Sequence, residues 1–335
     1  MRLRGINYDV GERYGHIMTR PEFDRAAARR DLGVIKNDLH CNAVRISGED
    51  PRRLTAAARD ALELGLEVWL SPVEHDKDER DTLEAAIACA AAAEELRQRH
   101  PRLVLVLGCE LTIFMPGLLA VGGGNVLDRL ASPSFREQLR TGAHNNPLNA
   151  FLARANDAVR AVFHGQVTYA SAPVEVVDWA LFDFVCLDYY PAQVDPLPQQ
   201  PYFAHGKPVV ITEVGCCTYQ GADDKGGMGW SIIDQHSTPV RELDGNYTRD
   251  ESLQARTVTA SLDRVDSAGV DGCFVYTFII PALTHSDDPR EDLDMASYGL
   301  VKSLGSAQGT AYPGTRWEPK ESFTAVACYY ARHEN

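Results

Sequence analysis

The stretch Pro208-Val-Val-Ile-Thr-Glu-Val-Gly215 combines an apolar β-like run with a carboxylate near its end and a glycine directly after it. A buried strand has no structural need for Glu213, because an unpaired ionised carboxylate is costly to remove from water. A second segment, Leu103-Val-Leu-Val-Leu-Gly-Cys-Glu110, has the same design. Carboxylates on the ends of two separate strands therefore predict an acid/base or nucleophile pair.

Short β-branched runs alternate with longer amphipathic runs along the whole chain. Helices are predicted near 23–39, 51–64, 79–99, 149–163, 174–180, 250–268 and 319–332. Eight strands are predicted at 3–9, 43–47, 67–72, 103–110, 167–171, 184–189, 209–214 and 273–279. This alternation implies an α/β fold with a parallel sheet. Eight units in 335 residues favour a single (β/α)8 TIM-barrel domain spanning residues 1–335.

Three connections are much longer than the usual handful of residues. Residues 111–148 follow the fourth predicted strand, 216–249 the seventh, and 280–318 the eighth. All three leave the C-terminal ends of strands, which is the face where barrel enzymes build their active sites. We therefore expect these long loops to surround the site.

Composition and charge limit the partners of the chain. A formal charge of −14 argues against binding to a nucleic-acid backbone and favours a neutral or cationic small molecule. No apolar run is long enough to span a bilayer, so we expect no membrane partner. The eight cysteines lack paired CxxC spacing and are typical of free thiols in a reducing compartment, which predicts a cytoplasmic protein. The oligomeric state is left open.

Several motifs match those of one enzyme group. Arg45 lies in the second predicted strand. Tyr189 and Tyr190 stand at the end of the sixth, and Glu110 and Glu213 lie at the ends of the fourth and seventh. Near the end of the chain, Ser-Tyr-Gly-Leu-Val at 297–301 and Trp-Glu-Pro-Lys-Glu at 317–321 precede the last predicted helix. With these features the chain resembles the retaining glycoside hydrolases of the (β/α)8 clan A. More loosely, it is similar to actinobacterial barrel proteins labelled abortive-infection proteins.

The resemblance implies a two-glutamate double displacement on a small glycoside. Glu213 would be the nucleophile and Glu110 the general acid/base, with carboxyl groups about 5–5.5 Å apart. Arg45 and either Tyr189 or Tyr190 would keep the nucleophile ionised. No metal or organic cofactor is implied. The further substrate-contact candidates are Asn7, His75, Cys109 and Trp230.

Two departures from the clan pattern leave alternatives open. Cys109 stands where clan members usually carry an asparagine before the acid/base, and Tyr276-Thr-Phe278 stands where they usually carry a tryptophan. Both changes concern sugar recognition. The same site could instead serve a lyase, isomerase or transglycosylase, or belong to a catalytically silent barrel that binds a sugar or a protein. The sugar, its anomeric configuration, exo or endo action and the roles of Cys216 and Cys217 are not indicated.

Overall fold

Eight parallel strands form a nearly closed barrel in the computed structural model, which describes residues 1–120, 124–190, 199–234 and 242–333. The sheet order is β7-β6-β5-β4-β1-β10-β9-β8. Its two edges meet where Ser171 pairs with Leu187, and the Asp188 N–H donates to the Ser171 carbonyl at 2.9 Å. The (β/α)8 prediction is thereby confirmed. The strands are β1 (Leu3–Asp9), β4 (Ala43–Gly48), β5 (Glu67–Pro72), β6 (Leu103–Cys109), β7 (Gln166–Ala170), β8 (Val185–Asp188), β9 (Val209–Val214) and β10 (Gly272–Val275).

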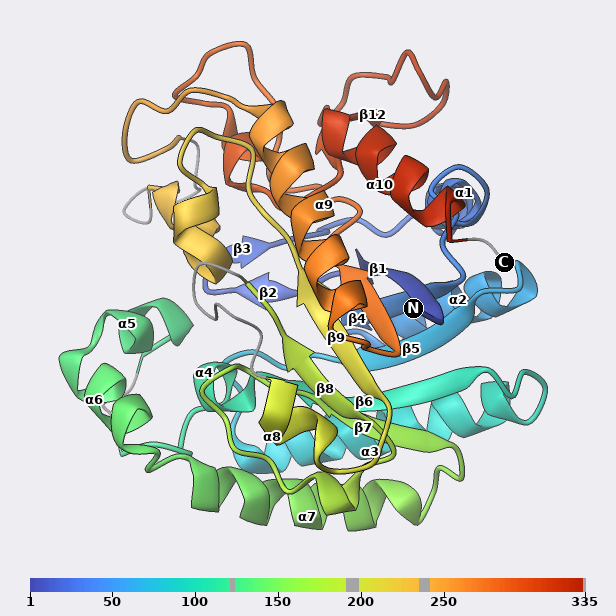
Figure 1. The fold of residues 1–335 in the computed structure, drawn as a ribbon, viewed down its shortest axis with the longest axis vertical. Coiled ribbons are helices and arrows are strands. Elements are labelled where there is room, and N and C mark those ends of the chain that lie inside the picture. Colours follow the sequence, from blue (N-terminus) through green and yellow to red (C-terminus); the bar gives the residue numbers. More distant parts are fainter. Residues whose placement is uncertain (121–123, 191–198, 235–241, 334–335) are drawn as a thin grey trace.

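Long helices surround this barrel (Figure 1). They are α1 (Arg25–Asn37), α2 (Pro51–Glu63), α3 (Glu79–Arg97), α7 (Asn145–Arg160), α9 (Glu251–Ser267) and α10 (Glu321–Ala331). Four of them begin at an aspartate whose side chain accepts a hydrogen bond from a backbone N–H of the first turn. These caps, Asp24, Asp50, Asp78 and Asp250, fix where each helix leaves the preceding loop.

The prediction of a helix at 174–180 is wrong. Only a short 3-10 turn, η1 (Trp179–Leu181), is present there. Glu175 is buried, and its carboxylate accepts hydrogen bonds from the Ala172 N–H at 2.9 Å, the Thr112 N–H at 3.0 Å and the Tyr169 hydroxyl. These bonds hold the segment against the barrel in a non-helical path, so tertiary contacts override the local pattern.

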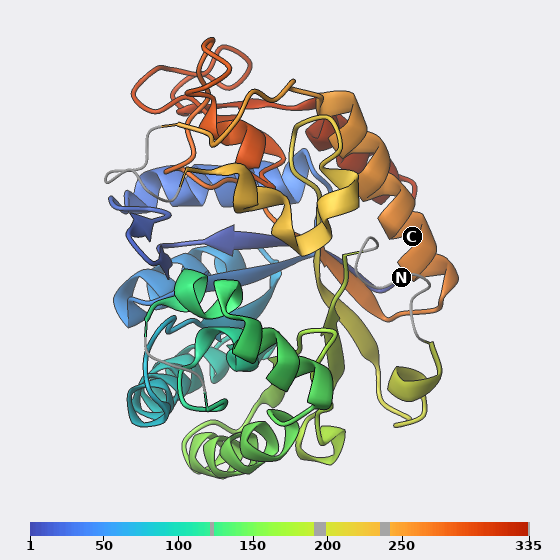
Figure 2. The ribbon, with the colours of Figure 1, turned by 90° about the vertical axis from the view of Figure 1, so that its left-hand side faces the viewer.

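The connections after the fourth, seventh and eighth barrel strands are long, as predicted, and carry structure of their own. The first holds α4 (Leu111–Phe114), α5 (Val126–Ala131) and α6 (Pro133–Thr141), and the second holds η2 (Asp223–Ile232). The third holds η3 (Leu293–Ala296), β11 (Val301–Ser303) and β12 (Trp317–Pro319). A hairpin of β2 (Arg13–Tyr14) and β3 (Ile17–Met18) follows the first strand, and α8 (Gln199–Phe203) precedes β9. In Figure 2, α5, α6 and residues 223–232 lie in front of the strand ends.

The barrel interior is packed with aromatic rings. Trp69 contacts Phe184 and Phe274, with ring centroids 4.9 and 5.1 Å apart. Gly5 makes room for this packing, because a Cβ at that position would lie 2.3 Å from the Phe274 ring. The barrel interior around Trp69 is therefore a packed core and not a pore.

No helix in the described ranges is long and apolar enough to cross a membrane. All eight cysteines carry free thiols, and only Cys328 among them is exposed.

Candidate active site

A cavity of about 440 Å³ opens at the C-terminal ends of the barrel strands. Pockets for small molecules usually measure about 300–1,000 Å³, so this one has the size of a small-molecule site. Most of the residues that the sequence singled out share it. Those lining the cavity are Glu213, Glu110, Arg45, Tyr190, His75, Cys109 and Trp230.

Glu213 stands near the end of β9 and is surrounded by hydrogen-bond donors. Arg45 donates to its Oε1 at 2.8 Å from β4, and the Tyr190 hydroxyl donates to its Oε2 at 3.0 Å. The guanidinium is 2% exposed and always charged. Both contacts favour an ionised carboxylate. A nucleophilic carboxylate needs this state.

Two further side chains, those of Asn7 and Ser71, hold Arg45 in position. Its Nη1 also donates to the Asn7 side-chain oxygen at 3.1 Å, and its Nη2 donates to the Ser71 hydroxyl at 3.2 Å. Asn7 in turn donates to the Thr212 carbonyl at 3.0 Å. The sequence suggested Asn7 as a substrate contact, but it is almost completely buried and does not line the cavity. Its contacts make it a support for Arg45.

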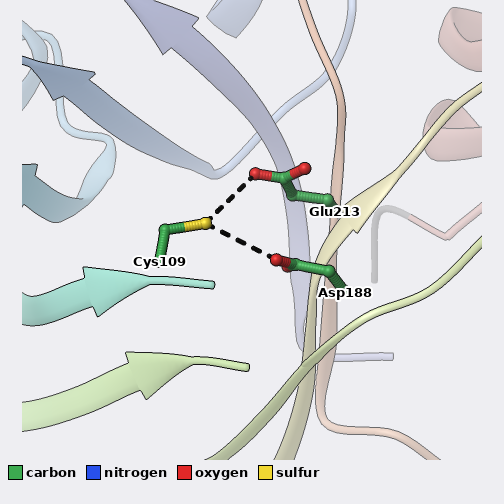
Figure 3. A group of neighbouring side chains, drawn as sticks. All are labelled: Cys109, Asp188 and Glu213. Carbon is green, nitrogen blue, oxygen red and sulfur yellow. Dashed lines mark hydrogen bonds between the residues drawn. The ribbon is translucent and has the colours of Figure 1, made fainter. Parts of the chain in front are cut away.

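Asp188 completes a cluster with Cys109 and Glu213 (Figure 3). It is the register partner of Glu213 on the neighbouring strand and is fully buried. Its Oδ1 accepts from the Thr212 hydroxyl at 2.6 Å. The Cys109 thiol donates over 3.5 Å to Asp188 and 3.6 Å to Glu213. Burial, and next the Glu213 charge, raise the pKa of Asp188 well above its usual range. Sequence reasoning left this residue out of the site.

The same cluster offers three ligand atoms within 4.8 Å of one another, from Cys109, Asp188 and Glu213. A cation there would lie beside the Arg45 guanidinium, which already contacts Glu213 Oε1 at 2.8 Å. Like charges at such a distance repel strongly in a buried site. The donor set therefore fits a metal ion poorly.

Glu110 has contrasting surroundings. It follows β6 with a left-handed backbone, φ 46°, which is strained for a residue other than glycine. The Leu111 N–H donates to the Tyr169 hydroxyl at 2.8 Å, and the Thr112 N–H donates to Glu175, which together hold this turn. Within the described chain no hydrogen bond reaches the Glu110 carboxyl.

The charge state of Glu110 follows from this environment. Burial raises its pKa well above the usual range, and the negative charges of Asp188, Glu213 and Glu175 raise it further. Arg45 acts in the opposite direction but does not compensate. The carboxyl is therefore suited to keep a proton near neutral pH. A general acid has this requirement.

His75 and Trp230 line other parts of the cavity. The His75 ring stacks on Phe114 at 4.1 Å, and burial lowers the pKa of His75 to about 4. The neutral ring must carry its hydrogen on Nδ1, because this nitrogen lies 3.0 Å from the Arg13 carbonyl. Its Nε2 is then an acceptor. Trp230 belongs to η2, and its ring is partly exposed.

The structure separates the two neighbouring tyrosines. Tyr190 reaches Glu213, whereas the Tyr189 hydroxyl accepts from Arg264 on α9 at 3.1 Å, outside the barrel. The Tyr189 hydroxyl therefore does not contact the Glu213 carboxylate, although the Tyr189 backbone N–H donates to the Glu213 carbonyl at 2.8 Å.

Sequence reasoning also missed polar residues on the β2–β3 hairpin. Glu12 and Tyr14 line the cavity, and the Tyr14 hydroxyl donates to Glu12 at 2.7 Å. The same hydroxyl lies 3.5 Å from that of Tyr276 at the end of the eighth strand. Glu12 and Tyr14 lie in a short hairpin, where the sequence shows no hydrophobic periodicity. Of these three residues only Tyr276 could be recognised from the sequence, as a residue at a strand end.

Several solved structures are similar to this one, but no protein family matches the sequence. The structure is similar to the GH113 β-mannanase AaManA from Alicyclobacillus acidocaldarius in complex with ManMIm (16% identity, TM-score 0.59, covering 98% of this chain and 97% of that one). It also resembles another GH113 β-1,4-mannanase (14%, TM-score 0.55, 98% of each chain). A β-glucuronidase from Parabacteroides merdae matches with 15% identity and TM-score 0.54, over 98% of this chain and 36% of that one.

No protein-family model matches the chain, and no curated protein sequence is similar to it. The abortive-infection likeness therefore has no support. At these identities the structural neighbours show the fold alone, a TIM barrel.

Proposed function

We propose that the protein is a retaining O-glycoside hydrolase acting on a small glycoside. The observation that carries the proposal is the contrast between two carboxyl groups in one cavity. Glu213 accepts hydrogen bonds from Arg45 and Tyr190, whereas Glu110 is half-buried and its carboxyl group makes no hydrogen bond among the described residues. Retaining hydrolysis needs one ionised and one protonated carboxyl group.

In the first step, a Glu213 carboxylate oxygen attacks the anomeric carbon. The bond between that carbon and the leaving oxygen breaks, and Glu110 gives its proton to the leaving oxygen. The aglycone departs as an alcohol, and the sugar stays attached to Glu213 as an ester. Arg45 and Tyr190 orient the attacking carboxylate throughout.

In the second step, Glu110, now ionised, takes a proton from water. The water oxygen bonds to the anomeric carbon, and the ester bond to Glu213 breaks. Both carboxyl groups return to their starting states, and the anomeric configuration is retained.

Sugar recognition would differ from the usual clan pattern. Cys109, a weak hydrogen-bond donor, faces Glu213 and Asp188 where an asparagine is usual. The hairpin residues Glu12 and Tyr14, together with His75, supply polar groups around the sugar. The free thiols also support our proposal that the protein works in a reducing compartment such as the cytoplasm.

The test is a screen of aryl α- and β-glycosides of common sugars, followed by NMR of the fresh product in water enriched in oxygen-18. A retaining hydrolase releases the sugar with unchanged anomeric configuration and one labelled oxygen. Product without labelled oxygen would instead indicate a lyase, isomerase or transglycosylase. Inverted product would rule out Glu213 as a nucleophile, and no turnover of any glycoside would favour the silent-barrel alternative.

A further inference from the structure

The cavity is divided into a polar part and an apolar part. The polar groups come from the barrel strands and the β2–β3 hairpin, among them Glu213, Arg45 and Tyr14. By contrast, apart from Glu110 itself, every described cavity-lining residue from the connection after β6 is apolar. These residues are Ile113, Phe114, Val126, Leu127, Leu130 and Leu139.

This apolar wall is firmly attached to the barrel. Arg129 of α5 is 3% exposed and donates to the carbonyls of Ile113 and Phe114 at 2.9 and 3.1 Å. The same guanidinium forms an ion pair with Asp76 at 2.8 Å. Asn125 and Asp128 form a capping box at the start of α5. The buried Arg129 and the capping box therefore hold α5 in place against α4.

Apolar side chains also stand on other elements around the cavity. Val174 follows β7 and is 46% exposed, and Met228 of η2 is 38% exposed. Both line the cavity, and both are among the few large apolar side chains that the described structure leaves open to water. Exposed apolar groups that converge on one cavity indicate a ligand that covers them.

Glu110 connects this wall to the reaction, because α4 begins directly after it. A general acid must contact the leaving oxygen, so the leaving group lies on the side of the cavity next to Glu110. Apart from His75 Nε2 beside Phe114, the hydroxyl groups of a second sugar would find few partners along this wall. Burying hydroxyl groups without hydrogen bonds is unfavourable. A hydrocarbon would gain from the same contact.

We propose that the wall formed by α4, α5 and α6 binds an apolar aglycone, so that the substrate is an alkyl-type glycoside and not an oligosaccharide. This inference rests on the proposed function. In this arrangement the hydrocarbon leaving group binds at the apolar wall, and the sugar binds among the polar groups.

The test uses methyl, butyl, hexyl and octyl glycosides of the sugar found in the screen, together with a disaccharide of it. Each added methylene that enters the cavity should raise kcat/KM roughly threefold to fourfold. Leu127→Asn and Leu130→Asn should flatten this chain-length dependence. Val176→Asn is the matched control, because Val176 is 68% exposed and lies outside the cavity, and it should keep the wild-type dependence.

A disaccharide cleaved as fast as the octyl glycoside would overturn the inference and leave the hydrolase proposal intact. Calorimetric titration of n-octanol into the wild-type protein provides a readout that needs no turnover. Octanol should bind to the wild type and the Val176→Asn variant and bind at least tenfold more weakly to Leu127→Asn. Absence of octanol binding to the wild type would contradict the apolar compartment. Octanol binding without turnover of any glycoside would overturn the hydrolase proposal, and with it the aglycone assignment, and would leave only an apolar binding site.

Discussion

Glu213 and Glu110 end two strands of one barrel and line one cavity, yet their surroundings are opposite. Glu213 is contacted by Arg45 and Tyr190, which donate to its two oxygens. Glu110 follows its strand in a strained left-handed turn, and burial with three nearby carboxylates raises its pKa. The comparison teaches that the roles of two chemically identical side chains are set by their neighbours.

The largest expected effect comes from removing each carboxylate in turn. Glu213→Gln should lower turnover by on the order of 10⁶-fold for every leaving group, because the covalent step is lost. Glu110→Gln should lower turnover of an alkyl glycoside by about 10²–10⁴-fold, because its leaving oxygen needs a proton. A nitrophenyl glycoside should be much less affected. Steady-state rates with both substrates measure the contrast, and equal losses in the Glu110 variant would contradict its role as the acid.

The two neighbouring tyrosines give a smaller and better controlled comparison. Tyr190→Phe removes a hydrogen bond to the Glu213 carboxylate and should lower kcat/KM by about tenfold to a hundredfold, the range expected for a bond to a charged group. Tyr189→Phe removes the contact with Arg264 outside the barrel and should leave kcat/KM unchanged. If both variants lose activity equally, the effect of the first is structural, and the assignment of Tyr190 fails.

Asp188 should give the smallest effect, on stability. Its pKa is raised in the folded protein, first by burial and next by the Glu213 charge. The folded state therefore binds this proton more tightly than the unfolded state, and stability is lost as the pH rises above the unfolded pKa, about 4. Asp188→Asn keeps an acceptor for the Thr212 hydroxyl and removes this loss. Its Tm relative to wild type should increase from pH 4 to pH 8, and a constant difference would count against an ionising Asp188.

Much of this arrangement was predictable from strand ends. The apolar runs before Glu110 and Glu213 located the fourth and seventh strands, and the alternation of elements indicated the barrel. The eighth strand, β10, ends at Val275, earlier than the predicted end at residue 279. The apolar residues that follow it form irregular chain, although their composition resembles that of a strand. A residue pattern indicates that a strand exists better than it indicates where pairing stops.

The remaining contacts depended on geometry that spacing does not encode. Tyr189 and Tyr190 directly follow β8, whose last residue, Asp188, faces the site. Alternation of side chains then puts Tyr190, and not Tyr189, on the side of Asp188, but the sequence alone does not show which side Asp188 faces. Glu175 was hidden inside a helix-like pattern and instead supports the turn that carries Glu110. Glu12 and Tyr14 reach the site from a hairpin that no period predicts.

The most direct test of the central claim is to trap the sugar on the protein. A 2-deoxy-2-fluoro glycoside with an activated leaving group slows the second step more than the first, so a covalent ester should accumulate. Proteolysis and mass spectrometry should then find the added mass on the peptide that contains Glu213, and Glu213→Gln should show none. An ester on any other carboxylate, or unlabelled protein that still releases the leaving group and yields inverted product, would contradict the account.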